Sequence, residues 1–310
     1  MSKPQRRVVL VGAGGQLGKT LQALWPHSHL NSSTRLIALT REQLDISDAR
    51  AVATVMNELC PALLINAAAY TAVDAAETDA DTAFAINATG AGNLARWAAG
   101  QAADTTRLIH VSTDFVFDGS ASEPYAEDAA CAPLGVYGAS KLAGEREILE
   151  AMPSACVLRT SWLYSEHGGN FVKTMLRLMA ERDELSIVND QIGAPTSTRS
   201  LGAVILAMAE ALLGSGHSLP AGVFQWSDGG DISWYDFAEE IQRQAVNSGL
   251  LSRAITLRPI PSSAYPTPAR RPAYSVMSRQ RVQEALACPQ TSWQAELADV
   301  IAVLSKEAGI

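Results

Sequence analysis

Short apolar runs alternate with longer helical patterns over the first half of the chain, and no other feature of the sequence constrains the fold as strongly. Each run is continuous rather than alternating with polar residues, which is typical of strands that helices cover on both faces. The alternation predicts an α/β fold with a doubly wound parallel sheet of the Rossmann type. The expected strands lie at residues 8–12, 35–39, 63–69, 107–112 and 155–160, and the expected helices at 16–25, 48–59, 79–99 and 137–150.

The part of the chain after residue 164 is less regular. With 310 residues, the chain is long enough for a large sheet and a smaller second unit. We therefore expect a dinucleotide-binding domain at 1–164 and a smaller C-terminal α/β substrate lobe made mostly by 165–310, with later strands free to return to the first sheet. Helical patterns are found at 171–182, 201–213 and 234–245, and the proline-rich segment 258–274 predicts an extended surface loop.

A glycine loop, GAGGQLG, follows the first expected strand directly. Gly12, Gly15 and Gly18 have the spacing GxxGxxG, whereas the older dinucleotide fingerprint would need glycine at Leu17. Glycines at a strand-to-helix turn let the backbone approach a pyrophosphate, whose charge is stabilised by N–H groups at the helix N-terminus. An ordinary glycine-rich turn is the alternative, and the position directly after VVLV favours the dinucleotide site.

Two further strand ends offer cofactor contacts. Arg41 follows the second strand, where an NAD-preferring site would have an acidic residue, so its charge favours the 2′-phosphate of NADPH, with NADH as the alternative. A solvated surface arginine is an equally simple interpretation. Asp45 and Ile46 lie where the adenine edge is expected. The small residues Ala67, Ala68 and Ala69 end the third strand and would let the cofactor pass close to the sheet.

The motif YGASK places Tyr137 and Lys141 four residues apart, on one face of the expected helix. Such a pair alone is only suggestive, because short motifs also arise by chance. Thr113 strengthens it, since it ends the fourth strand at the sheet edge where doubly wound sheets bind ligands. These residue types suit carbonyl reduction: the phenol is a general acid, the ammonium stabilises its anion and holds the ribose, and the hydroxyl polarises the carbonyl. In the alternative interpretation all three are ordinary structural or surface residues.

Charge and composition exclude several classes of function. A net charge of −8 argues against nucleic-acid and anionic-membrane partners, and no segment is apolar enough to span a membrane. The four cysteines form no CxxC pair and the five histidines lack ligand spacing, so we expect no metal site and free thiols in the cytoplasm.

Eight motifs occur in an order that resembles the dTDP-4-dehydrorhamnose reductases over nearly the whole chain: GGQLG, NAAAYTAVDAAE, STDFVFDG, PLGVYGASKLAGE, LRTSWLY, GNFVKTML, NDQIGAPT and WYDFA. The resemblance implies NADPH-dependent reduction of a keto sugar nucleotide at C4. It makes Thr113, Tyr137 and Lys141 the catalytic residues. It implies contacts with the sugar nucleotide through Thr113, Asp114 and Trp162. The alternative interpretation of Trp162 is a tryptophan that packs in the core. The resemblance also adds cofactor contacts at Gln16, Leu17, Tyr70 and Val111.

The chain departs from this family in two respects. Phe115 replaces the usual tyrosine of STDYVF, which we expect to be tolerated because Thr113 is retained. Some members form dimers through magnesium held by glutamates, and the matching positions here are Thr20 and Arg199. An arginine repels the ion, so we expect a monomer or weak homodimer without bridging magnesium. Two other functions stay open: reduction of another dTDP-4-keto-6-deoxy sugar, and the role of a non-catalytic regulatory subunit of methionine adenosyltransferase. The intact Thr113/Tyr137/Lys141 set argues against the second, because a binding subunit does not need catalytic residues.

Overall fold

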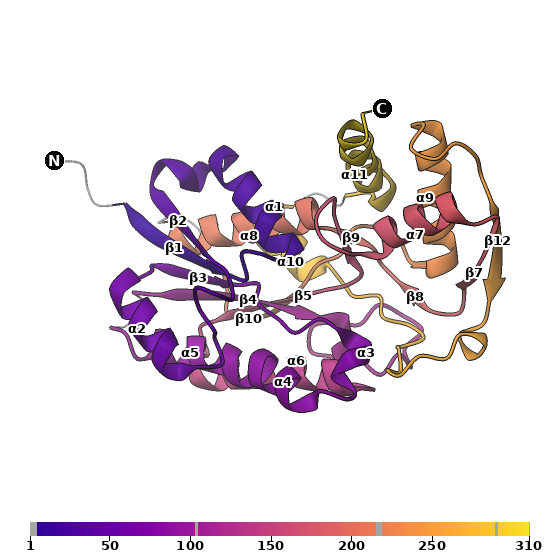
Figure 1. Ribbon diagram of the computed structural model, residues 1–310. Coiled ribbons are helices and arrows are strands. Elements are labelled where there is room, and N and C mark those ends of the chain that lie inside the picture. The colour runs from indigo at the N-terminus through magenta and orange to yellow at the C-terminus, as the bar shows by residue number, and fades with distance from the viewer. Residues whose placement is uncertain (1–4, 103–104, 215–218, 289–290, 310) are drawn as a thin grey trace.

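A six-stranded parallel sheet forms the centre of the computed structural model, which describes residues 5–102, 105–214, 219–288 and 291–309. The strand order is β10-β5-β4-β3-β1-β2, and every neighbouring pair is parallel (Figure 1). The expected doubly wound α/β fold is therefore confirmed, and the direction of winding reverses between β1 and β3. The strands are β1 (Arg6–Val11), β2 (Thr34–Leu39), β3 (Leu63–Asn66), β4 (Arg107–Thr113), β5 (Cys156–Thr160) and β10 (Gly222–Gln225).

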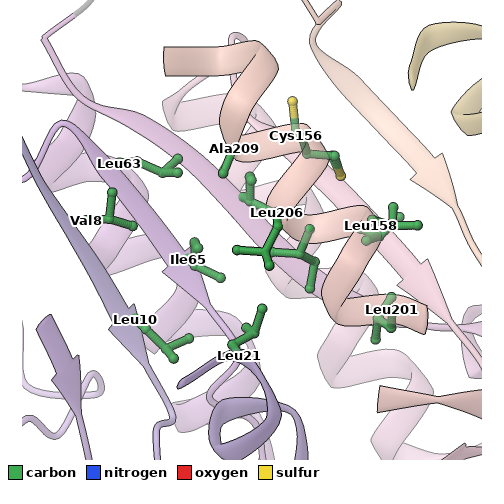
Figure 2. Close-up of a cluster of buried hydrophobic side chains, with 14 of the residues drawn as sticks. Val8, Leu10, Leu21, Leu63, Ile65, Cys156, Leu158, Leu201, Leu206 and Ala209 are labelled. Atoms are coloured by element: carbon green, nitrogen blue, oxygen red, sulfur yellow. The ribbon is translucent and has the colours of Figure 1, made fainter. Parts of the chain in front are cut away.

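Helices cover both faces of this sheet. Helices α1 (Gln16–Leu24) and α8 (Thr198–Leu213) pack on one face, and α2 (Ala49–Leu59), α5 (Ala91–Ala99) and α6 (Val136–Ala151) cover the other. Alternate residues of β1 divide between the two cores, Val8 and Leu10 facing α1 and α8, and Val9 and Val11 facing α2 and α5. Figure 2 shows the first core, in which Leu201, Leu206 and Ala209 of α8 lie over Ile65 and Leu158 of the sheet. This two-sided burial explains the continuous apolar runs in the sequence.

One long helical segment precedes β4. The sequence predicted a single helix over 79–99, whereas the structure has α4 (Ala80–Phe84), a π-helical stretch (Ala85–Gly90) and then α5. The π turn packs against α6 and the loop after β3. Its Asn87 binds both the backbone N–H and the carbonyl of Tyr70, and also the Ser140 hydroxyl. It therefore ties the loop after β3 to α6.

The C-terminal half has a core of its own, formed by α7 (Phe171–Glu181), α9 (Trp234–Asn247) and α11 (Trp293–Glu307). Three two-stranded sheets surround it: β6 (Leu163–Tyr164) with β9 (Thr196–Ser197), β8 (Ile192–Gly193) with β11 (Ile232–Ser233), and β7 (Glu184–Val188) with β12 (Thr256–Ile260). The remaining helices are short: α3 (Val73–Ala76), α10 (Gln280–Leu286), and 3-10 turns at Trp25–His27, His29–Ser32, Asp114–Val116 and Ser262–Ala264. Among the described residues no helix is both long and apolar enough to cross a membrane.

Helix α8 and strand β10 come from the second half of the chain but pack on and extend the first sheet, a return that the sequence-based division at residue 164 left open to later strands. The proline-rich segment was expected to be a loop throughout, and this is wrong for residues 258–260, which belong to β12 and pair with β7. A strand with one neighbour tolerates Pro259 because only one of its edges needs N–H donors.

Candidate functional site

A groove of about 530 Å³ lies over the carboxyl ends of β1, β2 and β3, at the point where the winding of the sheet reverses. Ligands of doubly wound sheets bind at this kind of crevice. Nine of the residues expected to bind the cofactor line it: Gly12, Gly15, Arg41, Asp45, Ile46, Ala67, Ala68, Ala69 and Tyr70.

The glycine loop forms the floor of this groove, and its glycines are needed for different reasons. Gly12 has φ +86°, and a Cβ there would lie 2.5 Å from the Ala68 nitrogen. A Cβ at Gly18 would lie 2.3 Å from the Gly12 carbonyl oxygen, so this glycine lets α1 pack closely on the turn. Gly15 caps α1 without any side-chain hydrogen bond to the first turn. The N–H groups of that turn can therefore bind an anion.

Gln16 and Leu17 do not line the groove. The Leu17 side chain is buried in the core beneath α1, so only its backbone remains for a cofactor. The Gln16 carboxamide oxygen accepts hydrogen bonds from Ser165 at 3.0 Å and Asn170 at 2.9 Å. Gln16 thus joins the glycine loop to the segment before α7.

The rim of the groove carries the polar side chains. Arg41 is exposed beside Glu42. Asp45 accepts hydrogen bonds from the Ser47 hydroxyl at 2.7 Å and the Ser47 N–H at 2.9 Å, and these bonds hold the pKa of Asp45 below its ordinary value. Ile46 is buried, with an exposed fraction of 4%.

Thr113 and Tyr137 meet at the end of β4. The Thr113 hydroxyl donates to Asp114 at 3.1 Å and accepts from the Phe115 N–H at 3.2 Å. Burial raises the pKa of Tyr137 to about 12, although a hydrogen bond with the Thr113 side chain acts in the opposite direction. The Phe115 ring packs edge-on against Tyr137, with centroids 5.5 Å apart. Phe115 thus keeps a ring contact with Tyr137 that does not need the hydroxyl of a tyrosine.

Lys141 is fully buried behind Tyr137, one turn further along α6. Its Nζ donates to the Val111 carbonyl oxygen at 2.7 Å and lies 3.2 Å from His110 Nε2. Burial lowers the pKa of Lys141 to about 8, while Glu145 raises it. Val111 was expected to contact the cofactor, and in the structure its carbonyl oxygen binds Lys141.

Two residues near Lys141 were not predicted from the sequence. His110 and Asn66 are both buried, and Asn66 Nδ2 lies 3.0 Å from His110 Nδ1. Asn66 directly follows the apolar run LLI, and His110 interrupts the apolar residues Leu108, Ile109 and Val111. A polar residue in such a run was the available signal, since buried polar groups need a partner. We call His110, Thr113, Asp114, Tyr137 and Lys141 the β4–α6 cluster.

Asp114 and Trp162, the remaining expected substrate contacts, lie on neighbouring segments. Asp114 is buried, its Oδ2 has no hydrogen-bond partner among the described residues, and burial raises its pKa from 3.8 to about 6. Trp162 has a left-handed backbone with φ 45° and stacks on Trp234, the ring centroids 3.5 Å apart. Left-handed backbone in a bulky residue is strained and occurs preferentially at functional sites.

A second cavity, of about 920 Å³, lies between α7, α9 and the β7–β12 sheet. Aromatic rings and two arginines share its wall: Phe171, Trp234, Tyr265, Arg182 and Arg271. Arg271 also binds Asp74 of α3 at 2.7 Å, which ties this wall to the loop after β3.

The two positions that correspond to magnesium ligands in some relatives are otherwise engaged. The Thr20 hydroxyl lies 2.7 Å from that of Thr198, and Arg199 pairs with Asp299 at 3.0 Å. Among the described residues there is no group of three or more acidic, histidine or cysteine side chains arranged to hold a metal.

Comparison with known proteins identifies the family. Residues 6–306 match the family described as RmlD substrate binding domain. The chain is 39% identical to the dTDP-4-dehydrorhamnose reductase of Aggregatibacter actinomycetemcomitans over 95% of its length and 98% of that protein, and 38% identical to that of Escherichia coli K12 over 93% and 94%.

Solved structures of such reductases have the same fold. The Clostridium acetobutylicum enzyme superposes with a TM-score of 0.86 at 36% identity, covering 96% of this chain and 99% of that one. The Bacillus anthracis enzyme, solved in complex with NADP, gives 0.85 at 35% identity with the same coverage. The groove, the β4–α6 cluster and these likenesses agree, and the chain belongs to the RmlD family of dTDP-4-dehydrorhamnose reductases.

Proposed function

We propose that this chain reduces the C4 ketone of dTDP-4-dehydro-β-L-rhamnose with NADPH, or with NADH, giving dTDP-β-L-rhamnose. One observation carries the proposal: a proton-bearing phenol, Tyr137, meets the Thr113 hydroxyl at the sheet edge that also bears a dinucleotide-sized groove. Its relatives named dTDP-4-dehydrorhamnose reductase support the choice of substrate.

The groove fits a dinucleotide. Gly12 and Gly18 keep the turn free of side chains that would fill it, and the uncapped first turn of α1 offers N–H groups to a pyrophosphate. Arg41 at the rim would meet a 2′-phosphate, and Asp45 with Ile46 would flank the adenine. Ala67, Ala68 and Ala69 leave room along β3, and the NADP bound to the Bacillus anthracis relative is consistent with this assignment.

The bound nicotinamide would supply a hydride to the carbonyl carbon, and the chain would manage the proton. Because its pKa is near 12, Tyr137 carries its proton at neutral pH and can donate it to the O4 oxygen. Thr113 would turn its hydroxyl proton from Asp114 to the same oxygen and stabilise the charge that develops there. Tyr137 is thereby the general acid and Thr113 the polarising donor.

Lys141 would stabilise the tyrosine anion that remains after this proton transfer. Its ammonium lies on the same face of α6 one turn away, and its pKa near 8 leaves it mostly charged at pH 7. The Val111 carbonyl oxygen fixes the position of its Nζ. Lys141 could also hold the ribose hydroxyls of the cofactor.

The substrate would extend from the β4–α6 cluster towards the second cavity. Asp114 and the strained Trp162 would contact the sugar, the ring of Trp162 covering the apolar face of the deoxy sugar. Within the cavity, Arg182 and Arg271 offer charge for a diphosphate and Trp234 offers a ring for a base. Residues 165–310 would in this way add Arg182, Trp234 and Arg271 to the contacts that residues 1–164 make with the sugar.

The test is an assay with purified protein, the keto sugar nucleotide and either NADPH or NADH. We expect oxidation of the cofactor that depends on the sugar, with NADPH the better donor. NMR of the product should show the L-rhamno configuration at C4. Another configuration would assign a different dTDP-keto sugar, and absence of turnover with both cofactors would contradict the proposal.

We further propose that the protein is a monomer or weak homodimer, because Thr20 and Arg199 supply no carboxylate for bridging magnesium. Sedimentation velocity should give the same mass with magnesium and with a chelator. The four free thiols suit a reducing compartment, so we place the activity in the cytoplasm.

A further inference from the structure

Three polar side chains form a buried row behind Tyr137. Asn66 of β3, His110 of β4 and Lys141 of α6 are at most 1% exposed. The row runs from Asn66 Nδ2 to His110 Nδ1 over 3.0 Å, and from His110 Nε2 to Lys141 Nζ over 3.2 Å. The reaction derived above uses Lys141 but gives no role to the other two residues.

The orientation of Asn66 determines where His110 carries its proton. Asn66 Oδ1 accepts the Ala68 N–H at 3.1 Å, so its NH₂ group faces the imidazole. Nδ1 of His110 must then accept, and a neutral imidazole with Nδ1 as acceptor has its proton on Nε2. Burial and the nearby Lys141 hold the pKa of His110 well below its ordinary value, which keeps the ring neutral.

The Nε2 proton points to Lys141 Nζ, and this contact discriminates between the two forms of the lysine. An ammonium has only donors, so it would oppose an N–H donor at 3.2 Å, whereas an amine has a lone pair that accepts the bond. We propose that His110 is a positioning residue for Lys141: its tautomer, fixed by Asn66, favours the amine form and makes Lys141 a ready proton donor.

The effect of His110 on proton transfer rests on the proposed function. In each turnover the Tyr137 O–H bond breaks as O4 gains a proton, while C4 gains a hydride from the nicotinamide, which is oxidised. The resulting tyrosine anion takes a proton from the Lys141 ammonium, whose N–H bond breaks, and the amine so formed accepts the His110 Nε2–H bond. A proton from solvent then restores the ammonium, and His110 is unchanged.

Other charged groups around Lys141 act on its pKa in known directions. Glu145, on the same helix, raises it, but Glu145 is itself paired with buried Arg159 of β5 at 2.7 Å. Asp114 acts on Tyr137 rather than on the lysine, and Glu77 binds the Val136 N–H at the start of α6. Burial is the main cause that lowers the pKa of Lys141. The proposed donation from His110 would act in the same direction.

Nitrogen NMR of protein labelled with [¹⁵N]histidine tests the tautomer without any turnover. The chain has five histidines, and His110 can be assigned by the signal lost in His110→Gln. We expect a neutral ring with the proton on Nε2 throughout pH 5 to 9. A proton on Nδ1, or an imidazolium that titrates in this range, would overturn the inference.

Carbon NMR of protein labelled at lysine Cε tests the effect on Lys141, one of only five lysines. Asn66→Asp gives Nδ1 a carboxylate acceptor, so the proton should move to Nδ1 and the titration midpoint of Lys141 should rise by about one pH unit. The new charge alone also raises this midpoint, so the matched comparison is Asn66→Asp in a His110→Gln background. An equal rise in both backgrounds would show that the tautomer has no effect.

The two proposals can fail separately. If the protein does not reduce the keto sugar but His110 carries its proton on Nε2, the proposed function fails and the assignment of the tautomer stands. If reduction proceeds while His110 is an Nδ1–H tautomer, the inference fails and the proposed function stands.

Discussion

The groove over the glycine loop and the β4–α6 cluster lie at the same sheet edge but are built by different physical means. The groove is formed by backbone and small side chains, with its charged groups on the exposed rim. The cluster is formed by polar side chains that are buried or, at Tyr137, half-buried, and burial is the largest cause of the pKa shifts of Asp114, Tyr137 and Lys141. The proposed cofactor binding would depend on shape and N–H groups, whereas the proposed proton transfer would depend on desolvation.

The shape of the groove should be most sensitive at Gly12. In Gly12→Ala the side chain meets left-handed backbone and a Cβ contact of 2.5 Å with Ala68. We expect the free energy of unfolding to fall by about 2–4 kcal/mol, from backbone strain and overpacking together. Urea denaturation measures this loss.

Gly14→Ala is the matched control for stability, because a Cβ at Gly14 has nothing within 4 Å. Its free energy of unfolding should stay within about 0.5 kcal/mol of the original. Equal losses in the two variants would mean that the close approach of Gly12 to Ala68 does not determine the groove.

Because the β4–α6 cluster is desolvated, its titratable groups should make the free energy of unfolding depend on pH. The folded pKa of Asp114 is raised from 3.8 to about 6, so folding favours its protonated form. The stability that this group contributes is complete below pH 4 and is lost as the pH rises through 6, in total about 3 kcal/mol. Denaturation of Asp114→Asn between pH 4 and 7 should lack this part of the decline.

Asp228 offers a control outside the cluster. Burial raises its pKa to about 6 as well, and its partners are Ser197, Ser200 and Thr291. Asp228→Asn should remove its own share of the decline over the same pH range and leave that of Asp114 in place. If Asp114→Asn keeps the full decline, Asp114 is not desolvated as described.

The smallest expected effect is at the exposed rim. In Arg41→Ala the dissociation constant for NADPH should rise roughly tenfold while that for NADH stays the same, because only NADPH has a 2′-phosphate for the guanidinium to bind. Fluorescence titration with both cofactors measures the ratio, with Arg50→Ala, exposed outside the groove, as control. An equal loss of affinity for both cofactors would show that Arg41 does not discriminate between NADPH and NADH.

The groove could be predicted from the sequence because its signals are local. Glycines directly after an apolar strand predict a phosphate-binding turn, and Arg41 and Ala67 each end a recognisable strand. Thr113 and Tyr137 could be predicted for the same reason, since the end of one strand and the start of one helix meet at one sheet edge.

Contacts between distant segments could not be predicted in this way. The tie of Gln16 to Asn170 and the row from Asn66 to Lys141 depend on side chains that come together only in the folded chain. The sequence left room for later strands to return to the first sheet, but the pairing of β10 with β5 is equally non-local, and two-residue strands such as β8 have no periodicity to detect.

Tyr137→Phe removes the proton that Tyr137 is proposed to donate, and turnover of the keto sugar nucleotide and NADPH affinity are measured on the same preparation. We expect a turnover number lower by about 10²–10⁴-fold, with the NADPH dissociation constant unchanged within about twofold. Turnover equal to that of the original protein would contradict the assignment of Tyr137 as proton donor.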